Sequence, residues 1–170
     1  MPRIAEAARK RFTSQRSPAD KALQALAYAL ELSDAVSAQS IGHGPLDFKS
    51  QDFLRHVGGR LARREREYLL CYFCTPERRL IKEEVLAFGE AGTVAVPTAT
   101  IFRRCLELGS RSLILAHNHP SGLAAPSQDD VRANLRLCSQ ARMLNITIEE
   151  HLIVGDAQIF SMRKAGLMEW

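Results

Sequence analysis

Two histidines and an aspartate near the middle of the chain have the residue types and spacing of a metal-binding site. His117 and His119 follow a short apolar run and are separated by one residue, so in an extended chain both imidazoles project from the same face. Asp130 follows in the first turn of a predicted helix. Two neutral imidazoles and one carboxylate, with one coordination position left open, are typical of a catalytic zinc site, in which the open position activates a water molecule.

The pair Ser127 and Asp130 has two interpretations. The two residues are three positions apart at the start of a predicted helix, as in a capping box, and an acidic residue there also suits the helix dipole. A helix with a capped first turn is equally a rigid support for a metal ligand. The two interpretations are compatible, and the sequence alone leaves both open.

The elements that must position these residues follow from hydrophobic periodicity. Short apolar runs indicate buried strands, and apolar residues spaced three and four apart indicate helices. The histidine-bearing strand ends at Pro120, which cannot extend a central strand. Because strands and helices intermix, we expect an α/β (α+β) class built on one central mixed sheet. The predicted strands are 68–74, 80–88, 93–96, 112–116, 146–154 and 158–161, and the predicted helices are 51–64, 99–108 and 127–144.

The amino-terminal part is predicted to be an appendage. Residues 1–45 read as a short helical extension, with apolar residues at helical spacing after Ser17 and Pro18. The stretch 40–45 contains two glycines and a proline, which favours a break in regular structure. Residues 46–170 then form the main domain.

Composition excludes several classes of protein. The chain has 170 residues, 46% of them hydrophobic and 25% charged, which is typical of a globular protein and not of a disordered one. No apolar run approaches the roughly 18 residues of a membrane-spanning helix, and the amino terminus has no signal-peptide pattern. Four cysteines without the density of a disulfide scaffold indicate a reduced, cytoplasmic protein. The net charge of +4 by itself does not indicate a nucleic-acid partner.

The central motif resembles that of a known family. The chain reads HNHP at 117–120, then six further residues, then Ser127-x-x-Asp130, which is similar to the JAMM motif of the JAB/MPN+ metalloproteases. The fuller HNHPSG, with the later HLIVGD and FS segments, resembles the RadC branch. This resemblance implies a cytidine-deaminase-like fold for the main domain and zinc ligands at His117, His119 and Asp130. It also implies that Ser127 helps to hold the oxyanion of a tetrahedral intermediate.

The same resemblance implies an upstream glutamate that takes a proton from water and passes it to the leaving amine. Glu67, directly before the strand predicted at 68–74, matches the expected placement best. Glu65 is the near alternative. Glu83 and Glu84, on the following strand, are weaker candidates.

Cysteine and histidine residues outside the motif have structural interpretations. Cys71 and Cys74 form a C-x-x-C, but positions three apart on a strand point to opposite faces, so a shared metal or disulfide is not expected. Cys105 and Cys138 fall in predicted helices and are assigned to the core. His151 either orients a metal ligand or packs, and packing is the interpretation we favour.

Three functions follow from these observations. The leading one is a zinc-dependent hydrolase that cleaves a peptide or isopeptide bond in an unknown protein or peptide substrate. The alternative is a non-enzymatic, DNA-repair-associated module that binds nucleic acid or a partner and keeps a structural zinc. A nucleobase deaminase ranks last because its H-x-E and P-C-x-x-C signature is missing. Substrate choice is expected to lie in the loops 89–97 and 121–126, and the oligomeric state is not predicted.

Nucleic-acid binding has only weak support. Arg60, Arg63, Arg64 and Arg66 form a basic cluster that we expect to be a solvated helix face, with phosphate contact as the alternative. RadC-like chains commonly carry an amino-terminal helix-hairpin-helix domain, and residues 1–45 lack its paired glycine turns. A direct DNA role is therefore not the expected one.

Overall fold

The structure is a computed structural model that describes residues 44–89 and 98–168. These residues all belong to the unit Val36–Trp170. Only positions 44 and 45 of the predicted helical extension are among the described residues. The predicted strand 93–96 lies outside them. The proposed boundary between residues 45 and 46 stays a prediction. Among the described residues, no helix is long and apolar enough to cross a membrane.

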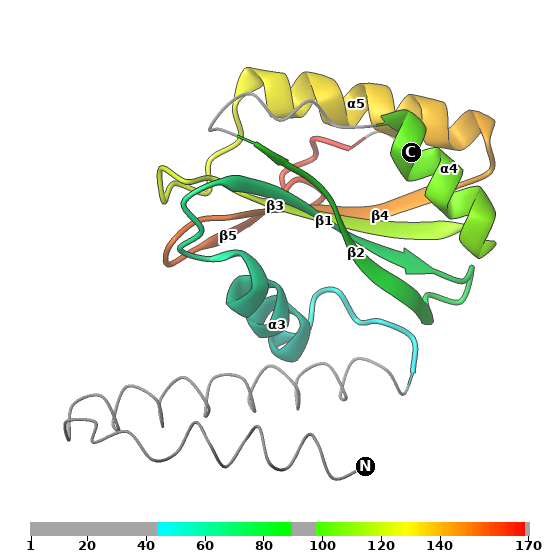
Figure 1. The fold of residues 1–170 in the computed structure, drawn as a ribbon, viewed down its shortest axis with the longest axis horizontal. Helices are drawn as coiled ribbons and strands as arrows, with labels where there is room; N and C mark the ends of the chain where they lie inside the picture. Colours follow the sequence, from blue (N-terminus) through cyan, green and yellow to red (C-terminus); the bar gives the residue numbers. More distant parts are fainter. Residues whose placement is uncertain (1–43, 90–97, 169–170) are drawn as a thin grey trace, which may run out of the picture. The chain divides into compact units, whose positions relative to one another are not determined.

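A five-stranded mixed sheet forms the centre of the domain, in the order β2-β1-β3-β4-β5 (Figure 1). The middle strand β3 pairs antiparallel with β1 and parallel with β4. Every residue of β3 is buried, because both faces of the sheet are covered there. The strands are β1 Glu67–Cys74, β2 Leu80–Gly89, β3 Ser112–Asn118, β4 Thr147–Val154 and β5 Ile159–Ser161.

Three helices cover the two faces of this sheet. The helix α3 (Gln51–Leu61) lies on one face, and α4 (Thr98–Leu108) and α5 (Gln128–Met143) lie on the other (Figure 1). The helix α5 connects β3 to β4, as the parallel pairing of these two strands requires. The predicted class, a central mixed sheet flanked by helices, is confirmed.

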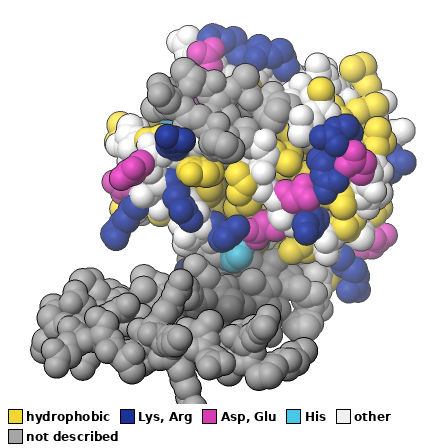
Figure 2. All heavy atoms as spheres, in the orientation of Figure 1, with side chains coloured by type: hydrophobic (Ala, Val, Ile, Leu, Met, Phe, Trp, Pro, Cys, Tyr) yellow, Lys and Arg dark blue, Asp and Glu magenta, His cyan; other side chains and the backbone are white. Residues whose placement is uncertain are grey.

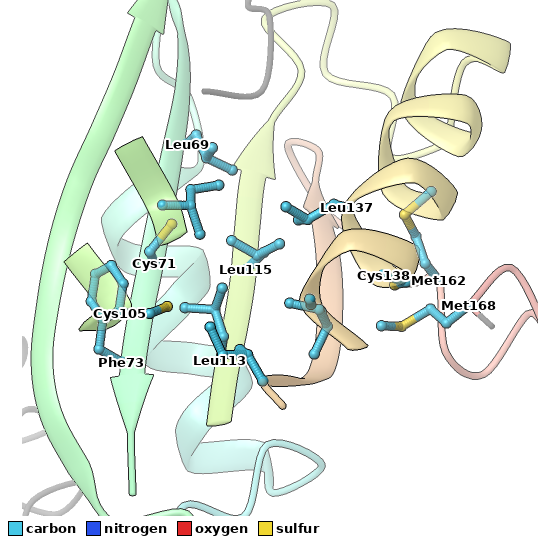
Figure 3. Packing of buried hydrophobic residues seen from close by; sticks show 14 of the residues in the cluster. Leu69, Cys71, Phe73, Cys105, Leu113, Leu115, Leu137, Cys138, Met162 and Met168 are labelled. Atoms are coloured by element: carbon cyan, nitrogen blue, oxygen red, sulfur yellow. The ribbon is translucent and has the colours of Figure 1, made fainter. Parts of the chain in front are cut away.

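Alternation along the strands divides the core into two clusters. On the α4 and α5 side, Leu69 and Cys71 of β1 meet Leu115 of β3 and Leu137 of α5 (Figure 3). Cys74 belongs instead to the cluster on the α3 side, so the two cysteines of the C-x-x-C do point to opposite faces, as predicted.

The cysteines are structural. All four are buried and form no disulfide. Burial raises the pKa of Cys74 to about 12 and that of Cys105 to about 11, so both remain protonated thiols at neutral pH. The core assignment of Cys105 and Cys138 is confirmed.

The end of α3 corrects one prediction. The sequence predicts a helix that continues to residue 64, but the helix ends at Leu61, and its C-cap Ala62 is extended. Arg63 then takes a left-handed conformation with φ of 58°, which a helix cannot accommodate. Arg63, Arg64 and Arg66 consequently lie in the loop before β1 and not on a helix face.

Charged side chains of both signs are mixed on the surface. Figure 2 shows basic and acidic groups interspersed on one face of the described part of the molecule. Arg60 pairs with Glu83, and Arg104 pairs with Glu84. The described residues on this face therefore form no continuous basic surface of the kind that duplex DNA binding uses.

Candidate metal centre

The pairing of β1 with β3 brings the predicted general base next to the predicted metal ligands. His117 of β3 lies opposite Leu69 of β1. Because the two strands are antiparallel, continuing this register by two residues places Glu67 beside His119. The first residue of β1 and the end of β3 thus meet at the same edge of the sheet. The strand β3 itself ends at Asn118, one residue before His119.

Asp130 joins this cluster from the first turn of α5. The two imidazole Nε2 atoms of His117 and His119 lie 3.0 Å apart. Asp130 Oδ1 is 3.4 Å from Nε2 of His117, and Asp130 Oδ2 is 3.3 Å from Nε2 of His119. The three side chains are between 6% and 17% exposed, so the cluster is largely shielded from solvent.

The donor set of this cluster fits a divalent cation. His119 Nδ1 is 2.9 Å from the carbonyl oxygen of Leu123, which only accepts, so Nδ1 donates and Nε2 of a neutral ring keeps a lone pair. That lone pair faces the Asp130 carboxylate, which also only accepts when it is ionised. Electron-pair donors at 3.0–3.4 Å from one another repel unless a cation or a proton lies among them. Two imidazoles and a carboxylate are ligands that Zn²⁺ prefers.

Charge at the centre is set by the contacts of Asp130. Burial alone raises the pKa of this carboxyl, but hydrogen bonds with His117, His119 and Ser127 outweigh burial and hold the pKa well below its usual range. The hydrogen bond to Asp130 in turn raises the pKa of His119. A proton and a cation therefore compete for the same position, as is general for metal sites.

Of the candidate glutamates, Glu67 is the one that reaches the cluster. It is 7% exposed, and one of its carboxylate oxygens lies within 4.8 Å of the ligand atoms of His117, His119 and Asp130. Glu65 is exposed and is not part of this group. The weaker candidates on β2 form ion pairs with arginines of α3 and α4.

Asn118, the residue between the two histidines, holds the backbone on either side of the predicted general base, Glu67. Asn118 Oδ1 accepts a hydrogen bond from the amide of Tyr68 at 2.9 Å, and Asn118 Nδ2 donates to the carbonyl oxygen of Arg66 at 2.9 Å. These contacts lie on either side of Glu67, so the residue is fixed from both directions. Sequence reasoning missed this role. The available signal was a polar residue at the end of a strand whose centre is apolar.

Ser127 forms the expected capping box. Its Oγ accepts from the amide of Asp130 at 3.1 Å, while Asp130 Oδ2 accepts from the amide of Ser127 at 2.7 Å. The Ser127 hydroxyl also lies 2.6 Å from Asp130 Oδ2 and donates its single hydrogen there. Ser127 therefore orients the carboxylate of Asp130. Its predicted contact with an oxyanion stays a prediction, because it needs the hydroxyl hydrogen that Asp130 holds in this structure.

Two glycines allow the loop between β3 and α5 to lie close to the turn after β4. Gly122 has a φ of +77°, and its carbonyl oxygen accepts a hydrogen bond from the amide of Asp156 at 3.0 Å. A Cβ placed on Gly155 would lie 2.4 Å from the Gly122 oxygen and 2.9 Å from the Ala124 nitrogen. This close approach fixes the loop that carries Leu123, the hydrogen-bond partner of His119.

His151 corrects another prediction. The sequence favours simple packing, but His151 lies within β4, and its Nε2 is 2.9 Å from Nδ1 of the predicted ligand His117. Its own Nδ1 is 3.0 Å from Oδ1 of Asn134 on α5. Burial is the largest cause that lowers the pKa of His151 well below its ordinary value. The prediction failed because positions 117 and 151 become neighbours only through the pairing of β3 with β4.

The fold and the site together define a mixed α/β domain with a candidate metal centre where β1, β3 and α5 meet. Residues 48–167 match the RadC-like JAB domain family, and the chain belongs to that family.

Relatives are found among UPF0758 proteins of Photobacterium and Vibrio species. The chain is 36% identical over 138 residues to one from Photobacterium profundum and 32% identical over 137 residues to one from Vibrio vulnificus. Each alignment covers 81% of this chain but 61% of the relative. A relative from Vibrio campbellii is 29% identical over 160 residues, which is 94% of this chain and 71% of the relative. The chain thus spans less than two thirds of the first two relatives.

Proposed function

We propose that the protein is a zinc-dependent hydrolase of the JAMM type that cleaves a peptide or isopeptide bond. The observation that carries the proposal is the position of a buried glutamate, Glu67, within 4.8 Å of the ligand atoms of three metal-binding side chains. Burying a carboxylate in a domain core is costly unless it is compensated, so such a group marks a functional site more often than a structural one.

His117, His119 and Asp130 hold the metal, and Ser127 orients Asp130. When bound, Zn²⁺ supplies Lewis acidity, which activates a water molecule and polarises a carbonyl group. Two imidazoles and one carboxylate leave a coordination position for this chemistry, as in other catalytic zinc sites.

Glu67 moves the proton. Its carboxylate accepts a proton from the attacking water and delivers it to the nitrogen of the leaving amine, so one group serves as base and then as acid. Asn118 keeps the backbone of Glu67 in register with His119 through its bonds to Tyr68 and Arg66. A fixed base avoids reorganisation during the reaction, which is the advantage of a group mounted on a strand.

The competing interpretation is a structural zinc in a binding module. A structural site is closed by four protein ligands, and Glu67 is near enough to be the fourth. The two interpretations differ in what Glu67 contributes. In a hydrolase it carries protons and leaves the metal affinity nearly unchanged, whereas in a structural site it is a ligand whose loss weakens binding.

Substitution of Glu67 by glutamine separates these interpretations. We expect Glu67→Gln to bind one zinc per chain with a Kd within about threefold of wild type and to lose about 10²–10⁴-fold in hydrolysis, the usual contribution of general acid–base catalysis. Glu65→Gln is the matched control, because Glu65 is two residues away, exposed and outside the cluster. Zinc content is measured by elemental analysis, and Kd by competition with a chelator.

The substrate is identified by comparing the proteolytic products of wild type and Glu67→Gln in a cell lysate. Cleavage sites that appear with wild type alone support the hydrolase and reveal its protein or peptide substrates. If Glu67→Gln loses its zinc, or if no peptide is cleaved while salt-sensitive DNA binding survives the substitution, the hydrolase is rejected in favour of the binding module.

A further inference from the structure

A chain of three hydrogen bonds, two buried and one part-buried, connects the proposed metal ligand His117 to the backbone of Leu167. His117 Nδ1 lies 2.9 Å from His151 Nε2, and His151 Nδ1 lies 3.0 Å from Asn134 Oδ1. Asn134 Nδ2 then donates to the carbonyl oxygen of Leu167 at 2.9 Å. We call these four residues the buried relay. Asn134 is 0% and His151 is 1% exposed, so water does not compete for these groups.

The direction of every bond in the buried relay is fixed by its last member. The Leu167 carbonyl oxygen only accepts, so the Asn134 atom that faces it is the amide nitrogen, and Asn134 Oδ1 faces His151. Because Oδ1 also only accepts, Nδ1 of His151 carries the hydrogen. His151 is 1% exposed and lies between an amide oxygen and another imidazole, where burying a positive charge would be costly. Its ring is therefore neutral, and Nε2 is an acceptor.

The same argument assigns the hydrogen on the ring of His117. Since Nε2 of His151 accepts, Nδ1 of His117 must donate to it. The remaining nitrogen of a neutral His117 ring, Nε2, is then left with a lone pair, and this atom is the one that faces Asp130 and His119. Each tautomer is assigned from the hydrogen-bond network.

We propose that Asn134 and His151 are positioning residues that fix the tautomer of His117 and so select Nε2 as its metal-binding nitrogen. The inference rests on the proposed metal centre and adds two residues to it. Asn134 is four residues after Asp130 on α5, so both side chains lie on the same face of the helix. The helix α5 thus supplies one ligand directly and orients a second ligand through β4.

The test uses the whole 170-residue chain and needs no substrate. The tautomers of His117 and His151 are read from long-range ¹⁵N–¹H correlation spectra of their imidazoles in the metal-free protein. Zinc Kd is measured by competition with a chelator. The variant is Asn134→Leu, which removes both the acceptor for His151 and the donor to Leu167. Ser110→Ala is the control, because Ser110 is also buried and hydrogen-bonded but lies at the opposite end of β3.

We expect both rings to be protonated on Nδ1 in wild type. In Asn134→Leu this preference is lost, and the zinc Kd rises about 10–100-fold, the usual effect of removing a partner that orients a metal ligand. Ser110→Ala lowers stability without changing the spectra or the Kd, which separates positioning from general destabilisation.

A wild-type spectrum in which either ring lacks a hydrogen on Nδ1 overturns the inference, and this measurement needs no variant that could misfold. It is also overturned if folded Asn134→Leu matches Ser110→Ala in both the spectra and the zinc Kd. Failure of the proposed hydrolysis is a separate outcome. A protein that binds zinc with the expected tautomers but cleaves nothing loses its proposed activity and keeps the buried relay.

Discussion

The properties of the centre depend on which atom of each side chain carries a hydrogen and which carries a lone pair. The Nδ1 atoms of His117 and His119 both lie within hydrogen-bond distance of a partner in the protein, which leaves their Nε2 atoms for a common ion. Ser127 does the same for the carboxylate of Asp130. Such partners turn three flexible side chains into a preformed site, which lowers the cost of ordering them when the metal binds.

Asp130→Asn tests the carboxylate ligand. Asparagine keeps nearly the same shape but removes the negative charge that faces the two imidazoles, so we expect the bound zinc to fall from about one per chain to near zero after dialysis. Asp129→Asn is the matched control, because Asp129 is the adjacent residue in the same helical turn and its side chain is 87% exposed. Elemental analysis of both variants makes the comparison. Equal zinc in the two would remove Asp130 from the ligand set.

Asn118→Ala tests whether the base must be fixed. Alanine leaves the Tyr68 amide and the Arg66 carbonyl without their partner, which costs about 1–3 kcal/mol of unfolding free energy. Because Glu67 lies between these groups, we also expect kcat for peptide hydrolysis to fall about 100-fold with little change in zinc Kd. Denaturant unfolding and steady-state kinetics measure the two effects. A variant that loses stability but keeps kcat would show that Asn118 only braces the strand.

At the scale of elements, the edge of the sheet is useful because three segments converge on it. The strand β1 begins there, β3 ends there, and α5 begins there after the loop 119–126. At the ends of buried strands, side chains are no longer required for packing, while the strands themselves remain rigid. This is why a site at such an edge combines partial exposure with accurate geometry.

Gly155→Ala tests the docking of the loop after β3. The added Cβ meets the backbone of Gly122 and Ala124, so the loop must move, at about 1–3 kcal/mol of unfolding free energy. Movement of Leu123 weakens its bond to His119, and we expect a higher zinc Kd as well. Gly44→Ala is the control, since nothing lies within 4 Å of its added Cβ. Thermal unfolding and chelator competition report both quantities, and unchanged values for Gly155→Ala would contradict the account of this loop.

Glu83→Gln tests the attachment of α3 to β2. Burial raises the pKa of Glu83, but contacts with His56 and Arg60 outweigh it, and the net pKa is lowered. A lowered folded-state pKa stabilises the fold above the unfolded value near about 4.3, and this contribution is lost as the pH falls through the folded-state pKa. We expect Glu83→Gln to lose about 1–2 kcal/mol at pH 7 and progressively less in acid.

The measurement for this variant is urea unfolding between about pH 3 and pH 7. Glu65→Gln serves as the reference, because Glu65 is an exposed residue of the same charge. A stability difference between Glu83→Gln and wild type that stays constant down to the lowest pH would mean that ionised Glu83 is not what holds α3.

At the scale of the whole molecule, sequence patterns predicted what depends on nearby residues. The predicted ligands His117, His119 and Asp130 could be named because their spacing is local. A fully buried strand such as β3 could be recognised because burial favours a nearly continuous apolar run. Asn118 and Asn134 were missed because their partners lie far away in the chain and meet them only in the folded sheet. For the same reason the end of α3 was misplaced. The loop after α3 is held by Asn118, which lies at the end of β3 and is 52 residues from Arg66 in the sequence.

The most direct measurement is the anomalous X-ray scattering of zinc in crystals of the protein grown with Zn²⁺. We predict one zinc per chain at about 2.0–2.2 Å from Nε2 of His117, Nε2 of His119 and a carboxylate oxygen of Asp130, with Glu67 outside the coordination sphere. A zinc peak that Glu67 ligates directly, or no peak among these side chains, would contradict a catalytic metal centre at this edge of the sheet.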